Sequence, residues 1–185
     1  SPEEASTQKS YQVVLTHEYK FDAWNRPFIL TSEFYYKYLK DIIPYEVDNI
    51  RIRYYADQKA TGYATGLDLR LNGEFVKGIE SWASLSLMKT AESIKYYLSP
   101  SGEILSQTDI NNGETYISDT LIRGIPRPSD QRINFSLFFQ DYIPFIPSFK
   151  VNLKLVFGTG MPFGAPHTER YQQKKRMSAY RRIDI

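Results

Sequence analysis

The sequence predicts an all-β chain built from about seven long antiparallel strands. Apolar and polar residues alternate at a period of two in run after run, whereas the three- and four-residue spacing of an amphipathic helix is weak almost everywhere. The connections between these runs alternate between short and long, which places the irregular parts of the chain at one end of the predicted sheet. Together these patterns favour one large sheet of consecutive hairpins.

The expected strands follow directly from the alternation. They cover residues 10–21, 28–38, 63–71, 81–91, 132–140 and 149–157, and a seventh begins at residue 180. Each run has an apolar and a mostly polar side, as where Leu67, Leu69 and Leu71 alternate with Asp68 and Arg70. The short connections are DAWNRP, NGEFVKGIE and IPFIPS, and the long ones span residues 40–62, 92–129 and 159–179.

Composition excludes several classes of protein. The 23 basic residues nearly balance the 21 acidic ones, which gives no electrostatic reason to expect nucleic acid as a partner. No cysteine occurs, so disulfides, thiolate metal sites and cysteine nucleophiles are excluded. The 15 tyrosines and 11 phenylalanines exceed what an ordinary soluble domain carries, although the mean hydropathy is negative.

The chain has no unbroken apolar run of about 18 residues, so we expect no membrane-spanning helix. Nothing at its amino end resembles a secretory leader. It begins without methionine and stops within the apolar alternation YRRIDI, and we therefore expect it to be part of a longer protein.

Strand length predicts where the apolar side lies. The runs reach about 10 to 12 residues, whereas strands of soluble proteins cluster near 5 or 6. Tilted by roughly 40°, such strands rise about 25 to 30 Å, which matches the hydrocarbon thickness of an outer membrane. The fold class that we predict is therefore an antiparallel transmembrane β-barrel fragment, with short periplasmic turns and long extracellular loops. The alternative is a soluble β-sandwich that binds carbohydrate or protein, in which a second sheet covers the apolar side.

Aromatic residues gather at the expected strand ends, while leucines fill the middles. This is the distribution of an outer-membrane barrel, where aromatic rings occupy the headgroup layers. The predicted upper girdle contains Tyr11, Tyr36, Tyr38, Tyr63 and Phe157, and the lower one contains Tyr19, Phe21, Trp24, Phe28, Tyr142 and Phe149. His17 and Ser32 are exceptions on the apolar side, and a register shift or a bulge would move His17 away from lipid.

The other side of the strands is expected to face a wide interior. It carries charged and amide side chains whose burial in a dry core would be costly, so they require water or a polar plug. These residues are Glu18, Lys20, Glu33, Lys37, Asp68, Arg70, Arg132, Asn134, Gln140, Lys150, Lys154, Arg182 and Asp184. Seven strands are too few to close a wide barrel, and further strands are expected from missing ends.

Several phrases resemble the later barrel part of a TonB-dependent outer-membrane receptor of the Bacteroidetes type. They are TSEFYYKYLKDIIPYEVDNIRIRYYADQKATGYATGLDL, GEFVKGIESWASLSLMKT, IPRPSDQRINFSLFFQDYIPFIPSFKVNLKLVFGTGMPFG and YRRIDI, and they cover most of the chain from Lys9 onward. The resemblance implies a 22-stranded barrel in the bacterial cell outer membrane, plugged by an amino-terminal domain and driven by the TonB energy-coupling complex. It further implies contact with outer-membrane lipid and lipopolysaccharide, and import of a scarce or bulky nutrient. Residues 1–185 would then be a partial barrel domain that lacks the plug and the final strands.

Within this interpretation, the connection DIIPYEVDNIRIRYYADQKA is the candidate for ligand contact. Its aromatic rings, carboxylates and guanidinium groups suit sugars, peptides or metal chelates. The candidate residues are Tyr45, Glu46, Asp48, Arg51, Arg53, Tyr54 and Tyr55. The alternative is that this segment extends the strands above the membrane through internal salt bridges. Lys174, Lys175 and Arg176 could pair with lipopolysaccharide phosphates or form a solvated loop.

Catalytic and cofactor motifs are not found. His17 and His167 lie far apart without metal-ligand spacing, and GTGMPFG lacks the spacing of a phosphate-binding loop. Glu18 and Glu33 could face each other like the carboxylates of a barrel hydrolase, but Lys20 and Lys37 beside them favour ion pairing. We therefore expect a transporter component without enzymatic activity, metal or cofactor.

Overall fold

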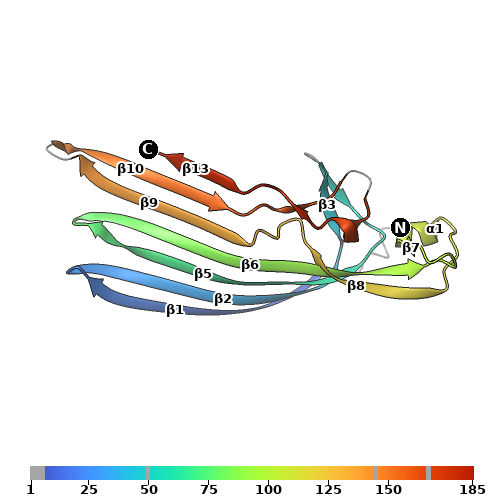
Figure 1. Ribbon diagram of the computed structural model, residues 1–185. Helices are drawn as coiled ribbons and strands as arrows, with labels where there is room; N and C mark the ends of the chain where they lie inside the picture. The colour runs from blue at the N-terminus through green and yellow to red at the C-terminus, as the bar shows by residue number, and fades with distance from the viewer. Residues whose placement is uncertain (1–6, 49–50, 144–145, 166–167) are drawn as a thin grey trace.

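The chain forms a large antiparallel sheet, as the alternation predicts. The computed structural model describes residues 7–48, 51–143, 146–165 and 168–185, apart from the side chains of Asp48 and Pro147. Seven strands follow one another in the order β1-β2-β5-β6-β9-β10-β13, with β7 and β8 also paired to β6 (Figure 1). All these pairs are antiparallel, which agrees with a series of hairpins.

The strands of this sheet are long. Their bounds are β1 Lys9–Ala23, β2 Arg26–Ile42, β5 Ala60–Val76, β6 Ile79–Leu98, β8 Ser118–Pro126, β9 Ile133–Ile143, β10 Ile146–Gly158 and β13 Tyr180–Asp184, with the short β7 Ile104–Leu105. All seven predicted strands are confirmed, and most extend beyond their predicted ends. The turn after β1 places Trp24 and Asn25 at φ 53° and 58°, the positive values that a two-residue hairpin of type I′ requires. The predicted turn at Pro144 and Phe145 lies outside the described residues.

Strand register gathers the apolar residues on one face of the sheet, which we call the apolar face. One continuous register row crosses all seven strands through Tyr19, Leu30, Leu71, Ala83, Leu137, Leu155 and Ile183. Residues in one row point to the same side, and those two positions away along each strand do so too. The alternation in each strand therefore adds up to a single surface.

The opposite, polar face carries mainly hydrophilic side chains. The neighbouring row contains Glu18, Thr31, Arg70, Ser84, Ser136, Val156 and Arg182. Ser84 and Ser136 hydrogen-bond across β6 and β9 at 2.8 Å, and Ser86 donates to the Asp68 carboxylate. Side-chain hydrogen bonds thus link neighbouring strands on this face.

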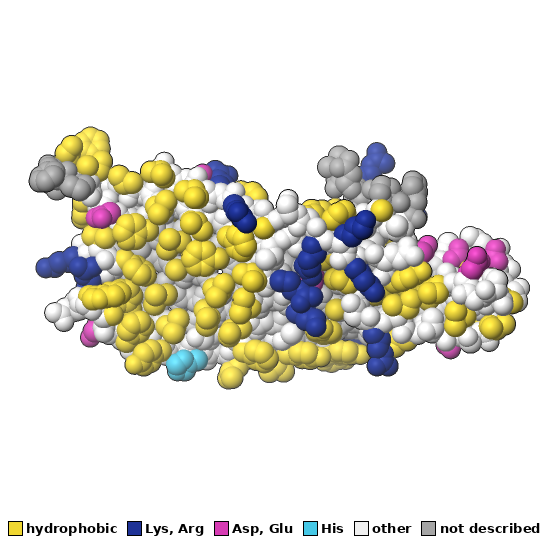
Figure 2. Space-filling view, in the orientation of Figure 1, with side chains coloured by type: hydrophobic (Ala, Val, Ile, Leu, Met, Phe, Trp, Pro, Cys, Tyr) yellow, Lys and Arg dark blue, Asp and Glu magenta, His cyan; other side chains and the backbone are white. Residues whose placement is uncertain are grey.

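The apolar face is not covered by another layer of protein within the described residues. Val13, Leu15 and Phe34 remain 72%, 70% and 52% exposed, and Leu69 and Leu137 are only partly shielded by their neighbours. Among the described residues the long strands contact their sheet neighbours, and no second sheet packs on this face. Figure 2 shows a broad apolar region extending over the strands on the short-turn side. The described chain therefore lacks the second layer that a sandwich requires.

Two details of the apolar face correct the expectations. His17 stands opposite Ser32, and the β1–β2 register runs without a shift from Lys9 to Ala23, so no bulge moves His17 off this face. Tyr142 pairs with Lys150 on the polar face, where the Lys150 Nζ lies 5.3 Å from the ring centre, and it does not belong to the lower girdle. The reason is the alternation of side chains, because the residues of β9 that point to the apolar face have odd numbers and Tyr142 has an even one.

The long connections contain regular structure where the sequence predicts irregular chain. The first forms a hairpin of β3 Tyr45–Asp48 and β4 Arg51–Tyr54, and the second contains β7, the helix α1 Gln107–Asn111 and β8. Ser106 caps α1 by accepting from the Asp109 backbone, and the Asp109 carboxylate accepts from the Ser106 backbone at 2.7 Å. The third connection contains β11 Pro162–Phe163, the 3₁₀ turn η2 Arg170–Gln172 and β12 Lys175–Arg176.

The hydrophobic core lies at this loop end, on the continuation of the polar face. The core residues are Leu39, Ile42, Ala60, Ile94, Tyr96 and Ile125, with Ile122 and Tyr171 packed against them. The Tyr171 ring meets Tyr96 edge to face at 5.1 Å. The sheet is therefore a single layer on the short-turn side, and it is covered on one face by its own connections at the loop end.

In the described part of the chain, no helix has the length and apolar character needed to cross a bilayer.

Candidate functional site

The residues predicted to contact ligand lie on and beside the β3–β4 hairpin. Its register pairs Tyr45 with Tyr54 and Glu46 with Arg53. Because side chains alternate across a strand, Glu46 and Arg53 share one side of the hairpin and the two tyrosines share the other. The hairpin thus has a charged side and an aromatic side.

On the charged side, Glu46 is bound into the fold. Glu46 is 8% exposed, and its carboxylate accepts hydrogen bonds from the Tyr55 hydroxyl at 2.8 Å and from the Gln173 side chain. Arg53 lies 3.6 Å from the second carboxylate oxygen. Burial, followed by the hydrogen bond to Glu46, raises the pKa of Tyr55, so the phenol keeps its proton and stays a donor. Glu46 and Tyr55 therefore join the hairpin to the third connection.

The aromatic side remains accessible. Tyr54 is 62% exposed, and its ring lies 6.1 Å from that of Tyr45. The guanidinium of Arg127 stands over the Tyr45 ring at 5.8 Å. Arg51 is exposed, whereas the side chain of Asp48 lies outside the described residues. Among the predicted contact residues, Arg51, Arg53 and Tyr54 combine exposure with groups that bind polar or planar ligands.

A second polar cluster surrounds Glu92, which the sequence did not indicate as a site residue. Its fully buried carboxylate lies 2.9 Å from Arg170 and 3.3 Å from Arg127. Arg170 also donates to the Pro126 carbonyl at 2.6 Å. Burial raises the pKa of Glu92 and outweighs the two guanidinium groups, which lower it. No local pattern could have shown this cluster, because its members come from three distant segments of the chain.

A third cluster is centred on Asp130, which is also fully buried. Its carboxylate accepts from the Thr90 backbone N–H at 2.7 Å, from Arg132 Nε at 2.8 Å and from Arg176. Arg176 donates further to the carbonyls of Asp130 at 2.7 Å and Gly160 at 3.1 Å. Arg176 is therefore part of the fold and not of a solvated basic run, whereas Lys174 and Lys175 are exposed.

The three clusters share the segment that contains η2. Arg170, Gln173 and Arg176 recur at intervals of three residues, and each binds a carboxylate in a different segment of the chain. The third connection is thereby fixed over the loop-end core at three points.

Glu18 and Glu33 do not face each other across the first hairpin. Glu18 stands opposite Thr31 and pairs with Lys20 at 3.2 Å, while Glu33 stands opposite Thr16 and accepts its hydroxyl at 3.2 Å. Lys37 stands opposite Ala64. This arrangement supports the ion-pairing interpretation for Glu18.

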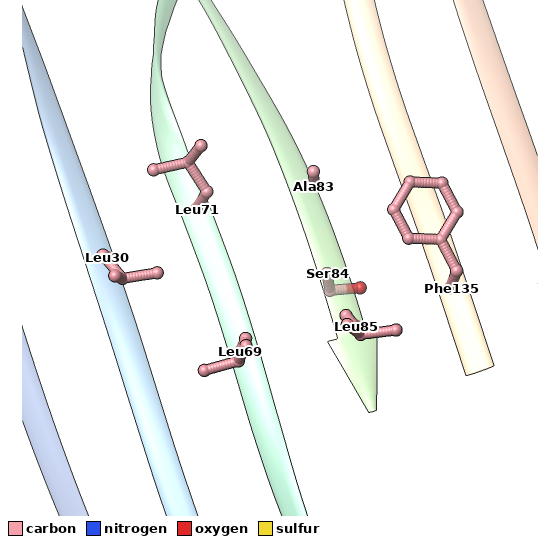
Figure 3. A pocket seen from close by; sticks show the side chains of 7 residues that line it. All are labelled: Leu30, Leu69, Leu71, Ala83, Ser84, Leu85 and Phe135. Atoms are coloured by element: carbon pink, nitrogen blue, oxygen red, sulfur yellow. The ribbon is translucent and has the colours of Figure 1, made fainter. Parts of the chain in front are cut away.

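A shallow hollow of about 140 Å³ opens on the apolar face (Figure 3). Its lining comes from β2, β5, β6 and β9, and consists of Leu30, Leu69, Leu71, Ala83, Ser84, Leu85 and Phe135. Figure 3 shows the leucines and the Phe135 ring on the near side of the ribbons and Ser84 behind β6. The hollow offers no polar group that would orient a small ligand, which distinguishes it from a specific binding site.

The described residues contain no cluster of His, Asp and Glu that could hold a metal ion. Comparison with known proteins found no matching family model, no matching curated protein and no matching solved structure.

Proposed function

We propose that this chain forms part of the barrel wall and the extracellular loops of a TonB-dependent receptor in a bacterial outer membrane. Such a receptor would import a nutrient such as a glycan, a peptide or a metal chelate. The observation that carries the proposal is the continuous apolar face, which spans seven strands without a covering layer in the described chain. An exposed apolar surface of this extent requires either lipid or a protein partner.

The spacing of aromatic residues on the apolar face supports lipid. Tyr11, Tyr38 and Tyr63 form one register row, and Phe21 and Phe28 form another about ten residues along β1. Ten residues of antiparallel strand cover about 34 Å, or about 26 Å along the membrane normal at a tilt near 40°. This agrees with the apolar band of roughly 25 Å in outer-membrane barrels.

Two features of the sheet support a larger barrel. In the described chain β1 pairs only with β2, so its second edge presents unbonded backbone groups that further strands would satisfy. The strand ends are also staggered, because the row through Leu15 reaches β9 at its first residue, Ile133, while β1 continues to Lys9. Tilted strands in a closed barrel require such a stagger.

The polar face supports a water-filled or plugged interior. Asp68 and Glu33 stand opposite each other there, and Arg70 and Arg182 lie on the adjacent row. So many charged side chains on one face are stable only where water or the polar groups of a plug reach them. The exposed residues of the β3–β4 hairpin would then be among those that gather ligand at the outer surface.

A charge placed on the apolar face tests the membrane assignment. We expect Leu69→Arg to lower the amount of folded full-length protein in the outer membrane at least tenfold, because an arginine near the bilayer midplane costs about 2–4 kcal/mol. The control Asp68→Arg puts the same side chain on the polar face and should assemble at close to the normal level. Equal assembly of both variants would contradict the proposal.

Import itself is tested separately from insertion. Cells that lack the full-length protein and cells that express it would be compared for uptake of labelled glycans, peptides and metal chelates. Uptake of at least one class should require the protein and should stop when the proton gradient is collapsed. Assembly in the membrane without any energy-dependent uptake would leave a wall protein but refute the transport role.

A further inference from the structure

A pair of polar residues interrupts the apolar face on β1 and β2. His17 stands opposite Ser32, both point to this face, and the His17 side chain is exposed. The register rows on either side of the pair consist of apolar residues. One row contains Leu15, Phe34, Leu67, Leu87 and Ile133, and the other contains Tyr19, Leu30, Leu71, Ala83, Leu137, Leu155 and Ile183.

The level of the pair makes it costly in lipid. Along β1, His17 lies between Tyr11 and Phe21, the residues that mark the two aromatic levels of the apolar face. At the proposed location this is the hydrocarbon layer, where a polar group without a hydrogen-bond partner is unfavourable. Because the register is regular along all of β1, the imidazole stays on this face. We therefore expect a protein group, and not lipid alone, to cover His17.

The surface around the pair has a protruding and a recessed position side by side. Ser32 is small, whereas Leu30 and Phe34 flank it along β2 and Leu69 stands opposite it on β5. A side chain from a facing molecule can therefore approach the backbone at Ser32, and His17 projects from the neighbouring strand. Facing sheets pack about 10 Å apart, a distance that one long and one short side chain fill together.

We propose that the β1–β2 hairpin is the contact surface between two copies of this protein in the membrane, an inference that rests on the proposed membrane location. Copies inserted in the same direction are related by a two-fold axis along the membrane normal, so residues at equal heights meet. His17 and Ser32 belong to one row, and each copy can therefore place its imidazole over the serine of the other. Imidazole and hydroxyl both donate and accept hydrogen bonds, which makes the pair complementary to itself.

The apolar residues around the pair complete the contact. Leu15, Tyr19 and Phe34 are 70%, 55% and 52% exposed, so a second copy would bury large side chains on both sides of the hydrogen bonds. A barrel wall is curved, and two such walls touch over few strands. The contact is therefore confined to β1 and β2, and the strands from β5 onward face lipid as in the proposed function.

The experiment measures association of the full-length protein in bilayers. Donor- and acceptor-labelled portions would be mixed in vesicles of phosphatidylethanolamine and phosphatidylglycerol, and energy transfer would be followed as lipid is added. We expect His17→Leu to weaken association about tenfold, the effect of two hydrogen bonds between membrane segments. The variant should enter vesicles as well as the unaltered protein does. The matched control Gln12→Leu changes a polar residue on the opposite face of β1 and should leave association unchanged.

An exchange of the two residues separates a specific contact from a general change of the surface. His17→Ser combined with Ser32→His keeps one imidazole and one hydroxyl in the same row, so we expect it to restore most of the association that His17→Leu loses. Failure of the exchange to associate better than His17→Leu would contradict the pairing of these two side chains.

Other results would overturn the inference as a whole. Absence of energy transfer in the unaltered protein at every lipid ratio, or equal association of His17→Leu, would show that the hairpin does not join two copies. Recovery of a complex with a different membrane protein, without self-association, would assign the surface to that protein instead. Flotation with the vesicles distinguishes this inference from the proposed function. Failure to enter bilayers would refute the membrane location, whereas entry as a monomer would refute only the contact between copies.

Discussion

At the scale of single residues, burial decides which polar side chains of the β3–β4 hairpin are available to a ligand. Glu46 is enclosed by Tyr55, Arg53 and Gln173, whereas Tyr54 on the opposite side is mostly exposed. The sequence indicates which types of side chain the hairpin carries but not which side faces the fold. That side is set by Gln173, which comes from a connection far along the chain, so local composition could not reveal it.

Tyr55 and Tyr54 provide a matched pair for testing this difference. We expect Tyr55→Phe to destabilise the hairpin by about 1–3 kcal/mol, because it removes a hydrogen bond to a buried carboxylate. Limited proteolysis would show faster cleavage between residues 41 and 60, and Tyr54→Phe should leave the cleavage rate unchanged. Because the folded pKa of Tyr55 is raised above 10, its contribution is complete below pH 10 and is lost only as pH rises through that higher value. A deficit that changes between pH 6 and pH 9, or equal effects of both variants, would contradict the role of Glu46 as its acceptor.

At the scale of elements, a change in the phase of the alternation marks where the apolar side chains of a strand switch from the apolar face to the opposite face. In β6 the apolar face carries Leu85 and Leu87, but beyond Ala91 the apolar residues Ile94 and Tyr96 point to the other face, into the loop-end core. The sequence therefore predicts β6 only to Ala91, although the strand continues to Leu98. Alternation with one apolar side identifies the seven strands. It misses the end of β6, where the apolar side chains point to the opposite face and into the core.

A single glycine, Gly73, determines how the aromatic cluster around Phe28 packs at the short-turn end of the sheet. Phe28 stands opposite Gly73 and is 2% exposed, with Phe21, Trp24 and Phe75 around its ring at 5.6, 5.9 and 5.2 Å. A Cβ atom at residue 73 would overlap the Phe28 ring, so only glycine lets this ring lie flat on the sheet. The cluster depends on the contact between Phe28 on β2 and Gly73 on β5, which the sequence of neither strand shows by itself.

We therefore expect Gly73→Ala to cost about 1–3 kcal/mol through overpacking. The measurement is the apparent thermal unfolding midpoint of the full-length protein in detergent. In a Phe28→Ala background the same substitution should cost clearly less, because the ring that it displaces is gone. An equal cost in both backgrounds would show that the Phe28 contact is not the cause.

At the scale of the whole molecule, the proposed function depends on what covers the apolar face. Its strand order and two-sided character follow from the period-two alternation and from connection lengths, and both could be predicted. The register could not, since Glu18 stands opposite Thr31 and not opposite Glu33. The three-point attachment of the third connection could not, because Arg170, Gln173 and Arg176 bind carboxylates that are distant in the sequence. The sequence pattern thus specifies the long strands of the sheet, and long-range polar contacts specify the structure at the loop end.

The most direct measurement is a nitroxide scan along β5 of the full-length protein in lipid bilayers. This chain has no native cysteine, so single cysteines at residues 67 to 71 can be labelled cleanly within it. Collision with dissolved oxygen should peak at residues 67, 69 and 71, and fall at 68 and 70, because alternate side chains face lipid. Labels at 67, 69 and 71 that are shielded from oxygen, or that a water-soluble nickel complex reaches, would show that protein or water covers this face and not lipid.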